Sequence, residues 1–224
     1  MKSKPYFLLL PLLACLFVAC GDDYHYPSVQ LEYLTAYSDA GGSSKYLLTD
    51  EGVKYAVLEN ADRLQMEADT FTRIVSNYEL VEAADGTTGV RLYAVLNAIS
   101  PLPLPAAKFE DGVKTDPVEL QSIWMGRDYL NILLGIKAQD GRHLLHFIED
   151  KVEKDDTTGR VNVELTLYHD ASNDVLAYTK RAYVSVPLWN YAAEGVSKVT
   201  VTLAINTYAG GIKKYQFDYI PHNN

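Results

Sequence analysis

The chain has 224 residues, a formal net charge of −9, 48% hydrophobic residues, 17 tyrosines and 2 cysteines. The hydrophobic fraction is too high for a disordered chain, and the acidic balance argues against a nucleic-acid partner, which requires a basic surface to neutralise phosphates. The same charge argues against electrostatic docking on an anionic lipid surface.

The first predicted element is an export signal over residues 1–19. Lys2 and Lys4 form a basic start, and an apolar run extends from Tyr6 to Val18. This run is shorter than the about 20 residues that a membrane-spanning helix needs, and its anatomy is that of a secretory signal peptide. We therefore exclude residues 1–19 from the fold.

Cys20 comes next, and Val18-Ala19-Cys20 resembles the lipobox of bacterial lipoproteins, with Phe17 in place of the usual leucine. In a lipobox a small residue precedes a cysteine that is lipidated and becomes the first mature residue, and two or three acyl chains give stable anchoring. A competing lipobox ends at Cys15, but cleavage there would leave an exposed apolar stretch. We expect acylation of Cys20; an ordinary signal peptide with a chance cysteine is the alternative.

Two acidic residues, Asp22 and Asp23, follow Cys20 after a single glycine. They resemble the export signal that sends Bacteroidetes lipoproteins to the outer leaflet, and residues 20–29 are also suited to a solvated tether. We expect an outer-membrane lipoprotein, exposed at the surface and in contact with the membrane through its N-terminal lipid anchor. Because no cysteine follows Cys20, the body can form no disulfide framework, thiolate metal site or cysteine nucleophile.

The remaining residues predict an all-β fold. Apolar and polar side chains alternate with period two, which is typical of strands with one buried face; such runs cover residues 90–96, 130–136, 161–168, 182–188, 199–205 and 215–219. Tyr46 to Tyr55 predicts a hairpin around Asp50-Glu51-Gly52. Only Leu58 to Ala68 favours a short helical turn. The pattern predicts antiparallel sheets packed in layers.

The clearest break in the body is Pro101-Leu-Pro-Leu-Pro105. Three alternating prolines forbid a central strand and favour an extended connector. The sequence therefore predicts two domains: residues 30–102, the size of a small β-barrel, and residues 103–222, the size of a β-sandwich.

Four stretches of the mature chain carry a family resemblance: the Tyr46–Gly52 hairpin, Asp116-Pro117, Trp124-Met-Gly-Arg-Asp-Tyr-Leu-Asn131, and the strand ending at Tyr168-His169. Together with the lipobox, they resemble the NigD-like lipoproteins of Bacteroidetes over most of the mature chain. The resemblance implies an OB-like barrel followed by a β-sandwich and a location in the cell envelope. It also implies a proposed bacteriocin-immunity role, and it supplies no catalytic residues.

The sequence offers little chemistry. His143 and His146 are three apart on a predicted strand, so they point to opposite faces and cannot share a metal ion there. The chain contains no Gly-x-Ser-x-Gly elbow, no glycine-rich phosphate loop and no His-Glu-x-x-His. We predict no catalytic residue, no metal and no cofactor; a cryptic hydrolase built from remote residues is an alternative.

Aromatic residues give the one hint of a ligand surface. OB barrels bind oligosaccharides across a sheet face with aromatic platforms, and the candidates are Tyr46, Tyr93, Trp124 and Tyr129. The competing interpretation is that the tyrosines are half-buried strand residues and that Trp124 anchors a core or a domain contact. We predict a non-catalytic interaction module with a protein, peptide or glycan partner.

Overall fold

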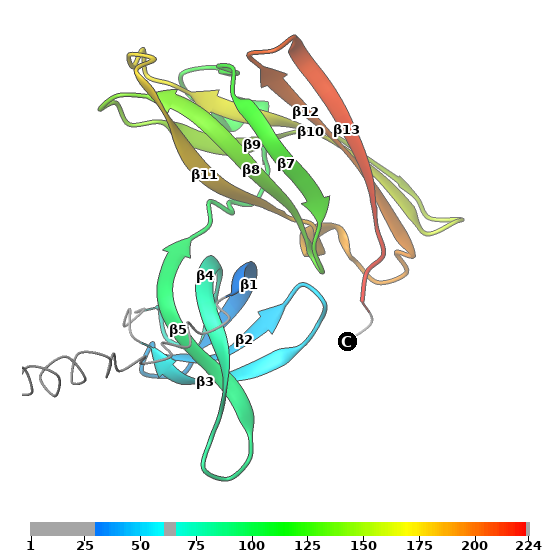
Figure 1. Cartoon of the computed structure of the whole chain (residues 1–224). Helices are drawn as coiled ribbons and strands as arrows, with labels where there is room; N and C mark the ends of the chain where they lie inside the picture. The colour runs from blue at the N-terminus through cyan, green and yellow to red at the C-terminus, as the bar shows by residue number, and fades with distance from the viewer. Residues whose placement is uncertain (1–29, 61–65, 223–224) are drawn as a thin grey trace, which may run out of the picture.

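The computed structural model describes residues 30–60 and 66–222 of the chain. Residues 30–60 and 66–97 form a five-stranded closed barrel in the order β1-β2-β3-β5-β4 (Figure 1). Its strands are β1 (Gln30–Ser38), β2 (Ser44–Thr49), β3 (Lys54–Asn60), β4 (Phe71–Glu82) and β5 (Thr88–Asn97). β3 and β5 run parallel and the other neighbours antiparallel. This is the Greek-key barrel of the OB fold.

The barrel is closed around a small apolar core supplied by alternate residues of its strands. The buried residues are Leu34, Ala36, Leu47, Ile74, Tyr78, Val90 and Leu92. The predicted hairpin around Asp50-Glu51-Gly52 is the β2–β3 turn, where Gly52 has a φ of 88° that favours glycine. The predicted helical turn is wrong at its start, because Glu59 and Asn60 pair with β5; residues 61–65 lie outside the described residues.

Residues 104–219 form two packed sheets, in the orders β13-β12-β10-β9-β6 and β11-β8-β7. The strands are β6 (Leu104–Pro105), β7 (Glu119–Met125), β8 (Tyr129–Ala138), β9 (Leu144–Asp155), β10 (Arg160–Asp170), β11 (Tyr178–Pro187), β12 (Lys198–Thr207) and β13 (Gly211–Tyr219). Two short 3₁₀ turns, η1 (Ala106–Lys108) and η2 (Trp189–Tyr191), accompany them. This confirms the predicted all-β barrel and sandwich.

The sandwich core follows the predicted alternation. Leu130, Ile132, Leu134 and Ile136 of β8 are all buried, as are Val184 and its neighbours on β11 and β12. Besides the short parallel pair of β6 and β9, one pairing in the sandwich departs from the predicted antiparallel pattern: β10 and β12 are parallel. The chain between them passes through β11 of the other sheet and then returns, so both strands run the same way. No helix of the described residues is long and apolar enough to cross a membrane.

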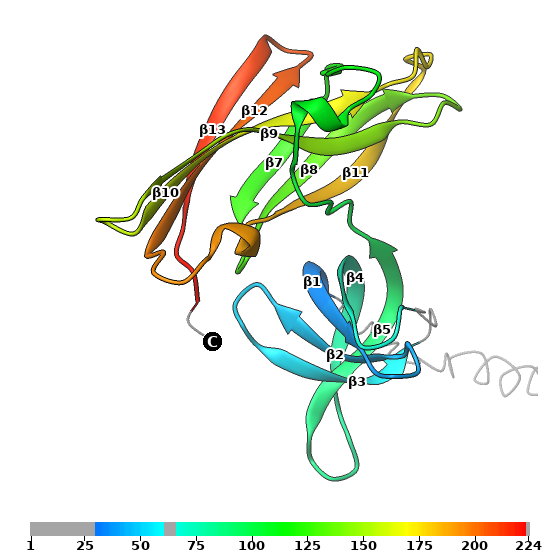
Figure 2. The same cartoon turned by 180° about the vertical axis from the view of Figure 1, so that it is seen from behind.

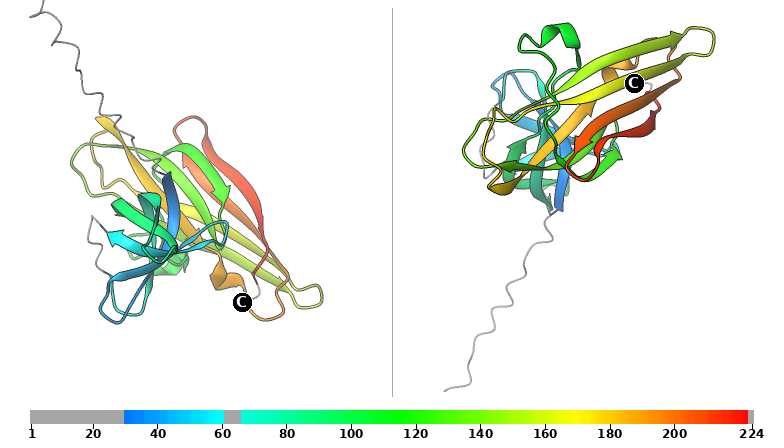
Figure 3. Two further views of the ribbon diagram at one scale, coloured as in Figure 1. Left: turned by 60° about the horizontal axis from the view of Figure 1, so that its bottom comes forward. Right: turned by 90° about the horizontal axis from the view of Figure 1, so that it is seen from above.

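The two domains meet end to end. In Figure 1 the barrel lies below the sandwich, and the β2–β3 turn reaches up to the β7–β8 turn. The view from behind shows the same contact, with η2 beside it (Figure 2). Seen from above, the sandwich covers the barrel (Figure 3). The surfaces where these elements meet contain the largest cleft described below.

Candidate functional site

The connector between the domains is bonded to the sandwich. The backbone N–H of Ile99 donates to the carbonyl of Tyr183 at 2.9 Å, and the N–H of Ser185 donates to the carbonyl of Ile99 at 2.9 Å. Ile99 thereby forms a parallel bridge with Val184 of β11. These bonds fix the start of the sandwich against the end of the barrel.

A buried polar network crosses the domain boundary beside this connector. At its centre is Arg73 of β4, whose side chain is 2% exposed. Its Nη2 donates to both carboxylate oxygens of Asp50, at 2.7 and 2.8 Å, and to Oδ1 of Asn131 at 2.9 Å. Its Nε donates to Oγ of Ser185 at 3.3 Å, and its Nη1 donates to Oγ1 of Thr35 at 3.2 Å. Asn131 and Ser185 belong to the sandwich, so one barrel side chain binds both domains.

Asp50, on the β2–β3 turn, closes the network from the other side. Nδ2 of Asn131 donates to Oδ2 of Asp50 at 2.7 Å, and Oγ of Ser185 donates to Oδ1 of Asn131 at 2.8 Å. A Cβ atom at Gly126 would overlap the Asp50 carboxylate. Glycine is therefore needed at position 126 for the close approach of the two turns. Charge-assisted bonds of this kind are stronger than neutral ones and fix geometry.

Aromatic rings enclose the arginine. The guanidinium carbon of Arg73 lies 4.3 Å from the ring centroid of Tyr129 and 5.6 Å from that of Tyr33. The Tyr33 hydroxyl donates to the carbonyl of Ile132 at 2.8 Å, which adds a second bond across the boundary. Burial raises the pKa of Tyr33 well above its ordinary value, so this hydroxyl stays a proton donor. The junction is therefore held by polar bonds that are shielded from water.

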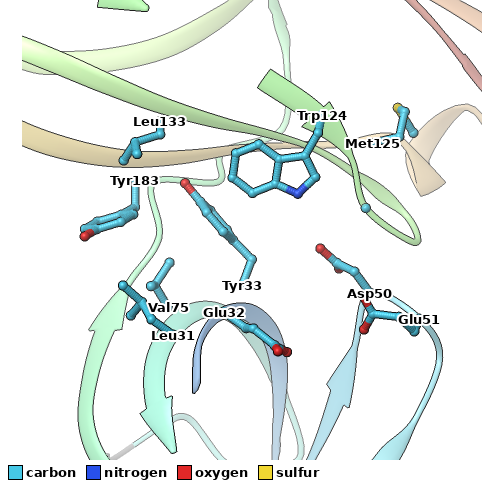
Figure 4. A pocket seen from close by; sticks show the side chains of 11 residues that line it. Leu31, Glu32, Tyr33, Asp50, Glu51, Val75, Trp124, Met125, Leu133 and Tyr183 are labelled. Atoms are coloured by element: carbon cyan, nitrogen blue, oxygen red, sulfur yellow. The ribbon is translucent and has the colours of Figure 1, made fainter. Parts of the chain in front are cut away.

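A cleft of about 400 Å³ opens next to this network (Figure 4). We call it the Trp124 cleft. Its walls come from β1, β4 and the β2–β3 turn of the barrel, and from β7, β8 and β11 of the sandwich. Its apolar lining consists of Leu31, Val75, Met125, Gly126 and Leu133, its aromatic lining of Tyr33, Trp124 and Tyr183, and its acidic lining of Glu32, Asp50 and Glu51. Both domains are therefore needed to form it.

The aromatic wall of the Trp124 cleft is ordered by contacts between rings. Tyr33 meets Trp124 edge to face, with centroids 5.4 Å apart and planes at 82°. Tyr33 also meets Tyr183, with centroids 6.1 Å apart. Trp124 is nevertheless 39% exposed. Such pairs prefer edge-to-face geometry, so the cleft presents preordered rings to solvent.

The carboxylates of the cleft differ in their partners. Asp50 accepts hydrogen bonds from Arg73 and Asn131. Glu32 is half-buried and accepts a hydrogen bond from the Tyr78 hydroxyl at 2.8 Å. Glu51 is exposed. The described residues that line the cleft include no lysine, arginine or histidine, so its electrostatic character is acidic.

A second cleft of about 270 Å³ lies elsewhere along the domain junction, and Asp50 lines this cleft as well as the first. We call it the Trp189 cleft, and its lining includes Tyr37, Phe71, Arg127, Asp128, Tyr129 and Trp189. Its rings form a row: Tyr37 lies 5.9 Å from Phe71, and Phe71 lies 5.9 Å from Trp189, centroid to centroid. Phe71 and Trp189 are 48% and 39% exposed.

The sequence profile of the NigD-like C-terminal beta sandwich domain matches residues 100–219, more than half of the chain. The chain belongs to the NigD-like family. A crystal structure of a NigD-like immunity protein from Bacteroides caccae ATCC 43185 shares 35% identity, with a TM-score of 0.73 over 89% of this chain and 100% of that chain. A protein of unknown function from Bacteroides vulgatus ATCC 8482 has the same fold, with 19% identity and a TM-score of 0.66 over 88% of this chain and 96% of that chain. No match is found among curated proteins.

The predicted family resemblance is thus confirmed, and the structure places the predicted ligand residues of this NigD-like chain at separate points. Trp124 lines the cleft named after it, and Tyr129 lines the Trp189 cleft. Tyr129 is only 5% exposed, because its ring packs against Arg73. These two residues lie on different sides of the Arg73 network and do not form one platform.

The two predicted ligand residues of the barrel, Tyr46 and Tyr93, lie outside both clefts. Tyr46 stacks on Tyr37 with ring centroids 4.4 Å apart, and the ammonium of Lys54 lies 3.6 Å from the Tyr46 centroid. Tyr93 donates to Oε1 of Glu79 at 2.6 Å and lines neither cleft. Cys20, Asp22 and Asp23 of this NigD-like chain lie outside the described residues, so their assignments stay predictions.

Two histidines form a hydrogen-bonded pair at one end of the NigD-like sandwich, which was not predicted from the sequence. His143 was predicted to lie on a strand, but β9 begins at Leu144 and His143 precedes it. Its Nδ1 lies 2.8 Å from Nε2 of His169, and its Nε2 lies 3.2 Å from Oδ2 of Asp174. His169 Nδ1 donates to the carbonyl of Asp116 at 3.0 Å. The histidine that His143 meets is therefore His169, from β10, rather than His146.

The direction of these hydrogen bonds follows from the carbonyl, which can only accept. His169 Nδ1 carries a proton, so Nε2 of the neutral ring accepts a hydrogen bond that His143 Nδ1–H donates. Burial lowers the pKa of His169, and His143 lowers it further, whereas Asp116 and Asp170 act in the opposite direction. Backbone donation from Gln139 lowers the pKa of Asp174 to about 2. No group of three or more metal-ligating residues is found among the described residues.

The hydrogen-bonded pair of His143 and His169 predicts that the stability of the protein depends on pH. The folded state binds a proton at His169 less readily than the unfolded state, whose histidines have a pKa of about 6.5. We therefore expect the free energy of unfolding to be highest above pH 6.5 and to fall as the pH drops below it, by at most about 1.4 kcal/mol per pH unit. Urea unfolding at pH 7.5 and 5.5 measures this. His169→Phe should flatten the dependence, and His146→Gln should keep it; equal slopes in all three proteins would refute the assignment.

Proposed function

We propose that this NigD-like chain is a non-catalytic, lipid-anchored protein of the outer envelope that binds a protein partner at the Trp124 cleft. The observation that carries the proposal is the construction of the cleft, with partly exposed aromatic rings from two domains beside a buried network that joins them. Exposed aromatic anchors in a pocket are typical of binding sites. Their order in the free protein lowers the entropic cost of association.

The polar groups of the Trp124 cleft support binding more than proton transfer. Both oxygens of Asp50 accept bonds from Arg73, and Glu32 accepts one from Tyr78. A general acid or base has to be free to reach the substrate proton at about 2.6–3.2 Å. A hydrolase at this site would depend on Glu32 and Glu51, so activity lost in Glu32→Gln and Glu51→Gln would replace this proposal by the hydrolase alternative.

Cys20→Ala is expected to abolish acylation of the chain, because its thiol is the proposed acceptor of the lipid and anchoring needs two or more acyl chains. Cells fed an alkyne-bearing palmitate give the readout, as label on the mature protein. Cys15→Ala is the matched control and should be labelled like wild type. Label lost in Cys15→Ala and kept in Cys20→Ala would move the cleavage site to Cys15.

The immunity role rests on the similarity to the NigD-like immunity protein from Bacteroides caccae ATCC 43185, at 35% identity. Deletion of the gene should sensitise the cells to a bacteriocin encoded in the same locus, and the wild-type gene should restore survival. Unchanged sensitivity would remove the immunity role for this chain. It would leave open a partner of another kind at the same cleft.

A glycan is the second candidate ligand, and the row of rings in the Trp189 cleft favours it. Phe71 and Trp189 expose aromatic surface beside the polar side chains of Arg127 and Asp128. Sugar rings stack on such surfaces and bond to the flanking polar groups. Retention of the protein on a carbohydrate array, lost in Trp189→Ala and kept in Trp124→Ala, would support this function; no retention would remove it.

A further inference from the structure

The charge of the Trp124 cleft is uncompensated at two of its three carboxylates. Asp50 is paired with Arg73, whereas Glu32 and Glu51 form no ion pair with any described residue. The net charge of the chain is −9, so the wider field has the same sign. A carboxylate that the ligand shields from water gains most from a cation that enters the cleft with it.

The indole of Trp124 lies beside these carboxylates. Figure 4 shows Trp124, Glu32, Asp50 and Glu51 around one space, with the indole nitrogen on the side of the carboxylates. A cation that lies over the indole face, within about 6 Å of the ring and away from its electropositive N–H edge, is attracted by the ring. A guanidinium also stacks flat on aromatic rings while it donates to carboxylates. The cleft therefore combines the two kinds of group that hold an arginine.

The apolar lining matches the stem of such a side chain. Leu31, Val75 and Leu133 line the same cleft, and Leu31 is 56% exposed. Long basic side chains cover apolar surface with their methylene groups while their charged end reaches polar partners. The volume of about 400 Å³ lies within the range of about 300–1,000 Å³ found for ligand sites.

The strand that carries Trp124 indicates that the cation comes from a polypeptide. β7 is an edge strand that pairs with β8 alone. Its last residues, Trp124 and Met125, line the cleft. An extended segment can pair with a free edge through its backbone while alternate side chains enter adjacent pockets. A small free cation would use only the carboxylates.

We propose that the Trp124 cleft binds an arginine or lysine side chain carried by an extended segment of the partner, with the side chain against the face of the Trp124 ring and its cation on the carboxylates of Glu32 and Glu51. The inference rests on the proposed partner-binding function and adds the chemical class that is recognised. The apolar residues hold the stem of the side chain, and the free edge of β7 holds the backbone of the segment.

The test is a titration of the full chain, in non-ionic detergent, with the blocked pentapeptide Thr-Val-Arg-Val-Thr. A Trp189→Phe background leaves Trp124 as the only tryptophan among the chain's two, so its fluorescence reports on the cleft. We expect a saturable change. Replacing the peptide arginine with citrulline, which keeps the shape and removes the charge, should weaken binding at least tenfold.

Glu32→Gln with Glu51→Gln should also weaken the arginine peptide at least tenfold, whereas the citrulline peptide should bind both proteins alike. Glu110→Gln is the matched control, because Glu110 is exposed and lies outside the cleft. Equal binding of the two peptides, no binding of either, or an unchanged affinity in the double variant would overturn the proposal. Spermidine that displaces the peptide at equal concentration would overturn the assignment to a polypeptide.

Failure of this proposal can be told apart from failure of the proposed function. If Trp124→Ala abolishes survival against the bacteriocin while the arginine and citrulline peptides bind alike, the cleft binds a partner but does not recognise its charge. If the wild-type gene protects the deletion strain and Trp124→Ala protects it equally, binding of the immunity partner at this cleft is itself refuted.

Discussion

Arg73→Met is expected to lower the free energy of unfolding by about 3–5 kcal/mol, the loss that follows when one partner of a buried charged pair is removed. Methionine fills a similar volume but donates no bond, so Asp50, whose side chain is 15% exposed, is left without its cation. Asn131, Ser185 and Thr35 lose a donor as well. Urea unfolding followed by tryptophan fluorescence measures the change, because both tryptophans line clefts at the domain junction.

Arg91→Met is the control for this experiment. Arg91 is also a barrel arginine with two carboxylate partners, Glu59 and Glu79, but its side chain is 35% exposed. Exposed pairs contribute little because water and salt screen them, so the loss should be small. A loss in Arg73→Met no greater than that in Arg91→Met would mean that the buried network does not hold the domains together.

Trp124→Ala is expected to weaken partner binding by about 30-fold, which corresponds to a loss of about 2 kcal/mol at an aromatic anchor. The reason is that Trp124 supplies the largest ring of the cleft and keeps 39% of its surface open to a ligand. The measurement is the affinity for the arginine pentapeptide, by calorimetry on the full chain.

The second tryptophan provides the control for this variant. Trp189 has the same exposed fraction, 39%, but lies in the other cleft. Trp189→Ala should bind the pentapeptide like wild type. Equal losses in both variants would indicate a general change at the junction instead of a site at Trp124.

The sequence was sufficient to predict the layers of the fold. Leu130, Ile132, Leu134 and Ile136 occupy alternate positions of β8 and all face the core, because successive side chains of a strand point to opposite faces. The parallel β10–β12 pair was missed, since alternation reports which face is buried and does not report which strands are neighbours.

The side-chain contacts across the domain junction could not be predicted from the local sequence pattern. Arg73 belongs to β4, and its partners Asp50, Asn131 and Ser185 are 23, 58 and 112 residues away along the chain. The family resemblance nevertheless contained a signal. Two of its stretches supply Asp50, Gly126 and Asn131, and the structure brings these three residues together. Gly126 makes room there for the Asp50 carboxylate.

The candidate ligand surface was predicted in part. Trp124 was named as an aromatic candidate, but Glu32, Glu51 and Tyr183 were not, because the cleft exists only where the two domains meet. His143 was assigned to a strand from its neighbours, and its contact with His169 depends on the start of β9 and the end of β10. Contacts between segments that are far apart in the sequence leave no periodic pattern in it.

Survival of cells under bacteriocin challenge tests the central claim, that this chain acts through the Trp124 cleft. A deletion strain would carry either the wild-type gene, the Glu32→Gln and Glu51→Gln double variant, Trp124→Ala, or the Glu110→Gln control, with equal protein levels verified. We predict that the wild-type gene and Glu110→Gln restore survival and that the two cleft variants do not. Full survival with both cleft variants would contradict the account.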